Sequence, residues 1–155
     1  MKFLRWVGCY ALAIVGGSVF MLFMHHLSGL VFPEAAMAKM PQDDPEALRI
    51  FMLSLGLGPK VAVLLSHWLG TGFGALLAMQ FAPVRSEWLR SVSMIKATIP
   101  GWAMGIWFTI GGAANAAMIP MPMWMLVSDL LGYLPFAFLV SKAIALRRMR
   151  RAVLS

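Results

Sequence analysis

The chain has 155 residues, of which 61% are hydrophobic and only 12% are charged, and its net charge is +7. A soluble domain of this composition would have far too little polar surface, so a water-soluble globular protein is excluded. The cations lie at the ends of apolar stretches rather than among aromatic residues on a polar face, so the charge does not indicate nucleic-acid binding. We expect an all-α, polytopic membrane protein.

Four long stretches almost free of Asp, Glu, Lys and Arg predict membrane-spanning helices, because about 20 apolar residues in a helix cross the hydrocarbon core. Asp129 interrupts the last stretch. Pro120 and Pro122 separate that stretch from the third one, since proline removes a backbone donor and ends a helix. One four-helix transmembrane domain is expected over residues 1–155, with spans at about 6–30, 60–82, 96–118 and 122–146 and an external segment at about 31–59.

Lysine and arginine are concentrated in alternate connections, which predicts the orientation of the spans. Cation-rich connections stay in the cytoplasm, so both termini are expected there, and the first and third connections are expected outside. The third connection has no cation. The cations assigned to the cytoplasm are Lys2, Arg5, Arg85, Arg90, Lys96, Lys142, Arg147, Arg148, Arg150 and Arg151, and those of the first connection are Lys39, Arg49 and Lys60.

A cleaved signal peptide is an alternative interpretation of the first span. Met1–Arg5 is a charged start, and residues 36–38 have the small-x-small form of a cleavage site. The apolar stretch between them is about twice as long as the usual apolar region of a signal peptide, which favours a span. The single cysteine, Cys9, allows no disulfide framework.

The second half of the external segment predicts a short amphipathic helix. Asp43 or Asp44 can cap its first turn, Pro45 suits the first helical position, and Gly56 can end it. Four apolar residues lie at helical spacing on one side, as in a helix that lies on the membrane surface or over the bundle. They are Leu48, Phe51, Met52 and Leu55. The segment is interpreted either as a plain re-entry into the second span or as a lid over an external cavity.

Glycines four residues apart predict where helices approach one another closely. Gly70 and Gly74 lie in the second span, and Gly101 and Gly105 lie in the third. Such strips let a neighbouring backbone come close, and in lipid it is packing rather than water exclusion that drives helices together. The strips are consistent with a compact monomer and with a dimer.

Polar side chains within the spans are the candidate functional residues. His67 in the second span and Asp129 in the fourth are each expected about 10 Å below the outer surface, because a helix rises 1.5 Å per residue. An intramembrane carboxylate should face the bundle interior and have a partner, so His67 is the candidate partner of Asp129. The candidate cluster in the outer half of the membrane is His25, His26, His67, Asn115, Asp129 and Tyr133.

Several segments, in this order along the chain, carry a resemblance to a known group. They are residues 26–33, residues 44–48, residues 70–74, and Asn115 together with residues 119–124. With them the chain resembles small bacterial integral membrane proteins that have no assigned function. The resemblance implies a four-helix protein of the bacterial cytoplasmic (inner) membrane and carries no chemistry. That group often has histidine at the position of Met121, so the resemblance assigns no role to this position.

The sequence indicates a non-enzymatic membrane protein, and we expect it to act as an accessory subunit of a membrane complex or as a homo-oligomer. There is no HExxH, no Gly-rich phosphate loop and no Ser-His-Asp set at a common depth, so neither catalysis nor a metal site is expected. No cofactor is expected either. The lipid bilayer is the expected partner, and the arginines at the C-terminus are expected to contact its head groups. These are Arg147, Arg148, Arg150 and Arg151.

The polar cluster leaves three interpretations open. It is a clamp that holds the second and fourth spans in register, or it belongs to an outward-facing vestibule for proton-coupled or small-solute transport by an oligomer. In the third interpretation its histidines bind haem or a related pigment. Four spans are few for a self-contained transporter, and the inner half of the membrane offers no continuing polar path.

Overall fold

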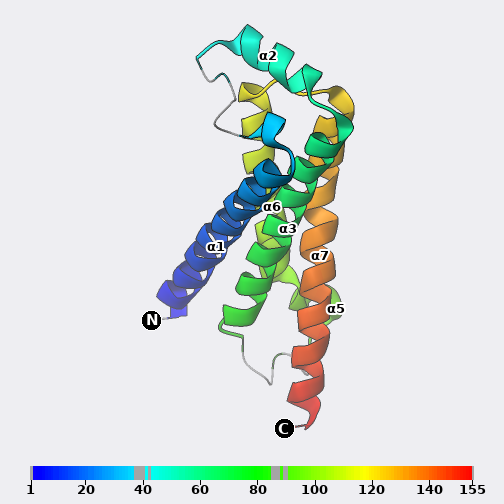
Figure 1. Ribbon diagram of the computed structural model, residues 1–155. Helices are drawn as coiled ribbons and strands as arrows, with labels where there is room; N and C mark the ends of the chain where they lie inside the picture. The colour runs from blue at the N-terminus through cyan, green and yellow to red at the C-terminus, as the bar shows by residue number, and fades with distance from the viewer. Residues whose placement is uncertain (1, 37–40, 42, 85–87, 89–90, 155) are drawn as a thin grey trace.

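The computed structural model describes residues 2–36, 41, 43–84, 88 and 91–154 (Figure 1). Over these residues the chain is helical, with no strand. Its elements are α1 (Lys2–Val31), the short 3-10 helix η1 (Pro33–Ala35), α2 (Pro45–Ser54), α3 (Leu57–Phe81), α5 (Met94–Ala97), α6 (Ile99–Met118) and α7 (Met123–Leu154). Five residues used in the sequence-based predictions, Met37, Ala38, Lys39, Arg85 and Arg90, lie outside the described residues.

Three helices, α1, α3 and α7, are long and apolar enough to cross a membrane. This confirms a helical protein with helices able to cross a membrane. The third predicted span corresponds to α6, which has 20 residues and no charged residue, so it is long enough at about 1.5 Å per residue. It is not among the three helices that are apolar enough to cross a membrane, so its crossing stays a prediction.

The ends of the helices differ from the predicted ones at two places. The third predicted span is interrupted at Thr98, which lies between α5 and α6 and whose hydroxyl donates to the carbonyl of Ile95 at 2.8 Å. Pro100 lies in the first turn of α6, where its missing N–H has no cost, so a new helix begins here. At the other end, α7 continues to Leu154, beyond the predicted end at about 146. Arginine is a good helix former, so the basic run does not end the helix.

The bundle is arranged around α3, which packs against α1, α6 and α7 (Figure 1). Both termini lie at one end of the bundle, and α2 lies across the opposite end. The predicted glycine strips are used inside the chain. Gly70 and Gly74 face α1, and a Cβ added at Gly70 would lie 2.8 Å from Cβ of Met21. Gly101 and Gly105 face α7, and a Cβ added at Gly105 would lie 2.9 Å from Cβ of Ala137. Both strips therefore serve the packing of a single chain.

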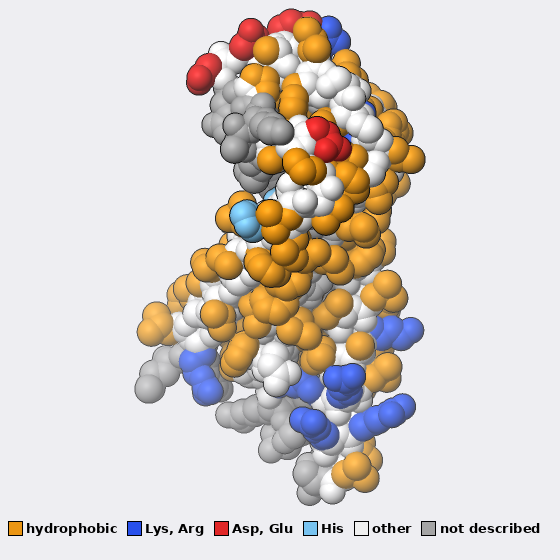
Figure 2. Space-filling view, viewed as in Figure 1, with side chains coloured by type: hydrophobic (Ala, Val, Ile, Leu, Met, Phe, Trp, Pro, Cys, Tyr) orange, Lys and Arg blue, Asp and Glu red, His pale blue; other side chains and the backbone are white. Residues whose placement is uncertain are grey.

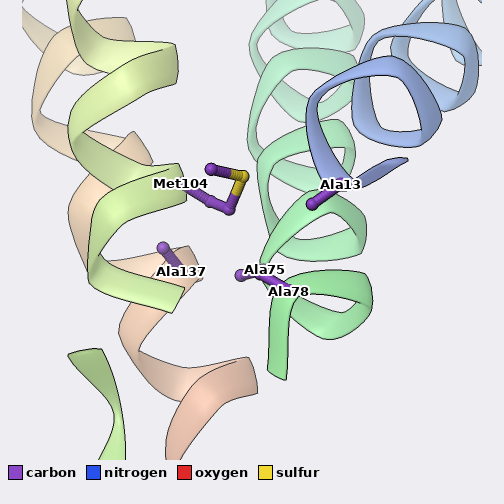
Figure 3. Close-up of a cluster of buried hydrophobic side chains, with 5 residues drawn as sticks. All are labelled: Ala13, Ala75, Ala78, Met104 and Ala137. Carbon is purple, nitrogen blue, oxygen red and sulfur yellow. The ribbon is translucent and has the colours of Figure 1, made fainter. Parts of the chain in front are cut away.

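Small side chains fill the half of the bundle nearer the termini. Ala13 of α1, Ala75 and Ala78 of α3 and Ala137 of α7 form a buried cluster with Met104 of α6 (Figure 3). In that view the long side chain of Met104 extends between α6 and α3. Because alanines are small, they let the four helix backbones come close at this cluster.

The helix α2 begins as the sequence predicts. Asp44 is its N-cap, and one carboxylate oxygen accepts hydrogen bonds from the backbone N–H groups of Glu46 and Ala47 at 2.9 and 3.1 Å. At the other end, the ammonium of Lys60 donates to the carbonyls of Leu53 and Leu55. The last carbonyls of a helix find no N–H donor within it, so Lys60 supplies one. Gly56, predicted to end α2, is the N-cap of α3. Lys60, expected only as an external cation, is 8% exposed and joins α2 to α3.

A second cation satisfies the opposite end of α3. The guanidinium of Arg148 in α7 donates to the carbonyl of Met79 at 2.5 Å and to that of Ala82 at 3.4 Å. The last carbonyls of a helix lack partners within it, and a donor from a neighbouring helix can satisfy them. Arg148 is partly buried and caps α3, whereas Arg147, Arg150 and Arg151 are exposed; contact of these arginines with lipid head groups stays a prediction.

Candidate functional site

The polar centre of the bundle is a histidine and a carboxylate from two helices that run in the same direction. Both α3 and α7 begin near α2, and both His67 and Asp129 lie in their first half (Figure 1). Nδ1 of His67 lies 2.9 Å from each carboxylate oxygen of Asp129. The two residues are 8% and 3% exposed. The depth argument from the sequence therefore identified a real contact between distant parts of the chain.

Tyr133 completes this pair from one helical turn further along α7. Its hydroxyl donates to Oδ2 of Asp129 at 3.0 Å and lies 3.2 Å from Nδ1 of His67. An ionised carboxylate only accepts hydrogen bonds, so the proton on the imidazole belongs on Nδ1 when the ring is neutral. That tautomer leaves the other ring nitrogen, Nε2, as an acceptor.

Two further side chains fix the position of this cluster. The ring of His25 in α1 packs edge-on against the ring of His67, with 5.1 Å between the centroids. The indole N–H of Trp68 donates to the backbone carbonyl of Asp129 at 3.3 Å. Gly132 makes room for this indole, because a Cβ at that position would overlap Trp68. The cluster is thus held by three helices, α1, α3 and α7.

The structure does not bring every candidate residue into the cluster. His26 is exposed on α1, because neighbouring residues of a helix point about 100° apart and His25 takes the inward position. Asn115 of α6 is partly buried and lines the cavity described below, without a hydrogen bond to the histidine or the carboxylate. No role for Trp68 was predicted from the sequence. Two signals for it were present, since Trp68 directly follows His67 and Gly132 lies three residues after Asp129.

A cavity of about 430 Å³ lies beside the cluster, and we call it the outer cavity. His67 and Tyr133 line it, and Asp129 contacts both of them. The other polar side chains in its wall are Ser18, His25, Ser28 and Asn115, and its large apolar ones include Met21, Leu22, Met52, Trp107, Phe108 and Met125. All helices of the outer half contribute to this wall.

The outer cavity is covered at one end and closed at the other. Met52 of α2 lines it and is buried, so α2 lies over the cavity, in agreement with the lid interpretation. At the opposite end the ring of Phe108 lies against α1 and α3, close enough that a Cβ at Gly17 or Gly74 would touch it. Beyond Phe108 the alanine cluster of Figure 3 fills the bundle. The cavity therefore stops about halfway through the bundle.

The polar cluster satisfies its own hydrogen-bonding needs. Among the described residues, every buried side-chain nitrogen or oxygen has a hydrogen-bond partner. The same residues contain no group of three or more His, Cys, Asp or Glu side chains arranged to hold a metal ion. The arrangement can hold α3 and α7 in register, and it presents an imidazole and a phenol to any molecule in the outer cavity.

Comparisons with known proteins add no identity. No family model, no curated protein and no solved structure matches this chain. The class of protein is therefore the one that the fold defines, an all-helical protein with helices able to cross a membrane.

Proposed function

We propose that this chain crosses the bacterial inner membrane four times, with both termini in the cytoplasm. Two observations support the orientation. Both termini lie at the same end of the bundle (Figure 1), and the visible Lys and Arg side chains gather mainly at that end, with the acidic side chains around α2 at the other (Figure 2). Connections rich in cations are retained on the cytoplasmic side.

Cysteine labelling tests this topology, because Cys9 is the only cysteine and is buried. In a Cys9→Ala background, Asp43→Cys is expected to react with a membrane-impermeant maleimide in intact spheroplasts, and Arg150→Cys only after lysis. The reverse pattern would contradict the orientation. Reaction of both positions in intact spheroplasts would place both ends of the bundle on the outer side of the membrane. That result would contradict the proposed four spans.

We further propose that the protein is not an enzyme and that it binds a small molecule in the outer cavity. The observation that carries this proposal is the position of the buried His67–Tyr133 wall beside a cavity that is closed by Phe108 and covered by α2. Small-molecule sites are typically concave, mainly apolar and equipped with a few polar groups that orient the ligand. A mainly apolar cavity with a few polar side chains is suited to a mainly apolar molecule with hydrogen-bonding groups.

Native mass spectrometry of protein extracted in mild detergent from its own membranes tests this function. We expect an additional mass on the wild-type chain. Gly111 lines the outer cavity, and a Cβ there would meet no atom within 4 Å, so Gly111→Leu adds a large side chain at the cavity wall without displacing the cluster. Gly8 is a matched helical glycine with equally open surroundings and no part in the cavity, so Gly8→Leu is the control.

The expected result is loss of the additional mass in Gly111→Leu and its retention in Gly8→Leu. A chain without bound mass in all three proteins would contradict ligand binding. The same spectrum tests the role of an accessory subunit, which predicts a protein partner of defined mass that remains attached in both variants.

The buried His67–Asp129 pair also favours a second function, proton-coupled transport of a small solute by an oligomer. Paired ionisable groups within a membrane are typical of proton relays. The closed floor at Phe108 gives this function less support, because a transport path requires that floor to open. Flux into liposomes containing purified protein tests it, and equal flux by wild type and Asp129→Asn would contradict it.

Haem binding through histidines has less support from the geometry. A haem ligated by both His25 and His67 would have to lie between their rings. The two rings touch edge-on, so no porphyrin fits between them. Visible absorbance of protein purified from its own membranes tests this function directly, and a colourless preparation would exclude it.

A further inference from the structure

A second hollow lies at the end of the bundle where the termini are found. Its volume is about 620 Å³, and its wall is formed by residues of α1, α5 and the start of α6, together with Pro83, Val84 and Trp88. The lining residues used here are Arg5, Trp6, Trp88, Lys96, Val84 and Ile99. We call it the basic hollow, and none of its lining residues belongs to the outer cavity.

Two cations from different helices share the basic hollow. Arg5 belongs to α1 and Lys96 to α5, and neither forms an ion pair with any described residue. The described acidic side chains are remote from it in the fold, since Asp129 lies in the cluster with His67 and the others lie in or near η1 and α2. Two positive charges facing one hollow favour an anionic occupant.

The rest of the wall is suited to the region between head groups and acyl chains. Trp6 stacks on Tyr10 with 5.7 Å between the ring centroids, so its indole is held in place at the edge of the hollow. Trp88 adds a second indole, and tryptophan is enriched where a membrane meets water. Val84 and Ile99 continue the wall with apolar surface that matches a hydrocarbon chain.

We propose that the basic hollow binds the phosphate group of an anionic phospholipid, with Arg5 and Lys96 on the phosphate and an acyl chain along the apolar wall. Basic pockets between transmembrane helices on the cytoplasmic side are a recognised form of lipid head-group site. This site is independent of the outer cavity, so either proposal can fail without the other.

Lipid titration followed by native mass spectrometry tests the proposal. Delipidated protein in neutral detergent is titrated with phosphatidylglycerol and, separately, with phosphatidylcholine. The site variant is Arg5→Gln/Lys96→Gln. Its control is Arg49→Gln/Lys142→Gln, which removes the same charge from exposed side chains that do not line the basic hollow. Thermal unfolding of both variants in the same detergent shows whether each is folded.

We expect phosphatidylglycerol to bind wild type and the control variant with similar affinity and the site variant about 30-fold more weakly, since each cation near a lipid phosphate contributes about 1 kcal/mol. Phosphatidylcholine should bind all three weakly. Equal affinity of phosphatidylglycerol for the site and control variants would overturn the proposal, and so would equal binding of the two lipids by wild type.

Inorganic phosphate distinguishes a lipid from a soluble anion. Inorganic phosphate added to lipid-free protein should bind more weakly than phosphatidylglycerol, because it lacks the acyl chain that the apolar wall contacts. Saturable binding of inorganic phosphate that is as strong as lipid binding, and is lost in Arg5→Gln/Lys96→Gln, would assign the hollow to a soluble anion and overturn the lipid assignment.

Discussion

The imidazole of His67 and the carboxylate of Asp129 meet at 2.9 Å although 62 residues separate them in the chain. The pair joins α3 to α7 at one position along their lengths, and the hydroxyl of Tyr133 donates a hydrogen bond to the carboxylate. A shift of α7 by one residue would turn Asp129 away by about 100° and leave a buried carboxylate without a partner. The pair therefore helps to determine the register of the two helices, together with the hydrogen bonds of Trp68 and Arg148 between them.

The first prediction concerns the energetic coupling of this pair. His67→Phe and Asp129→Leu are each expected to lower the free energy of unfolding by about 3 kcal/mol, because each leaves the other buried group with only the Tyr133 hydroxyl as a partner. The double variant should cost less than the sum, since it replaces both groups by apolar ones of similar size, although the Tyr133 hydroxyl then loses its acceptor. Unfolding in detergent by heat or by sodium dodecyl sulfate measures the three differences.

Thr109 offers a control for that cycle. Its hydroxyl donates to the carbonyl of Gly105 within α6, so it has no contact with the pair. Thr109→Val combined with Asp129→Leu should be additive within about 0.5 kcal/mol. Additivity in the His67 and Asp129 cycle as well would show that the two side chains are not coupled.

The second prediction concerns the space that Gly132 leaves for Trp68. Gly132→Ala is expected to destabilise the protein by about 1–3 kcal/mol, because the new Cβ would overlap the indole and displace its hydrogen bond to Asp129. Gly111→Ala meets no atom within 4 Å and should be neutral or stabilising, since alanine favours a helix over glycine by up to about 1 kcal/mol. In detergent, the thermal midpoint of Gly132→Ala should fall, and that of Gly111→Ala should stay unchanged or rise. Similar shifts would show that the indole moves aside without cost.

The third prediction separates two neighbouring arginines. Arg148→Gln is expected to lower the free energy of unfolding by about 1–3 kcal/mol, because the carbonyls of Met79 and Ala82 lose a charged donor. Arg147→Gln removes the same charge from an exposed position and should change the stability by less than about 0.5 kcal/mol. Thermal unfolding of both variants decides. Equal effects would mean that net charge matters and the cap does not.

The fourth prediction concerns the N-cap of α2. Asp44→Ala should destabilise this helix by about 1 kcal/mol, because two backbone N–H groups lose their acceptor. Hydrogen exchange of the amides in residues 45–54 is expected to accelerate, while exchange in α3 stays unchanged. Asp43→Ala is the matched control, since the structure assigns the cap to Asp44 and the neighbouring aspartate is exposed. Equal acceleration in both variants would contradict the role of the cap.

Part of this structure could be predicted from the sequence because its signals are local or depend only on depth. The lengths of the uncharged stretches predict helices able to cross a membrane, and Asp44-Pro45 marks the start of α2. His67 and Asp129 could be paired in advance because two helices that start from the same side place residues with similar offsets at similar depth. No rotation angle was needed for that argument beyond the requirement that a carboxylate face the interior.

Rotation and long side chains account for what could not be predicted. The first span is apolar on all sides, so nothing in it indicates that His25 faces the cluster and His26 does not. Lys60 and Arg148 were interpreted as cations at the ends of spans. Both bind carbonyls of a neighbouring helix, and such contacts depend on where the bundle places that helix. A sequence pattern does not distinguish a cation in water from one that caps a helix.

The order of synthesis gives the link between α3 and α7 a further meaning. A chain that enters the membrane span by span delivers His67 long before Asp129, and the carbonyls of Met79 and Ala82 before Arg148. During this interval the imidazole of His67 lacks its carboxylate partner, and the last carbonyls of α3 lack the donor that Arg148 later supplies. α7 carries both partners of α3, so a chain without that helix lacks both contacts.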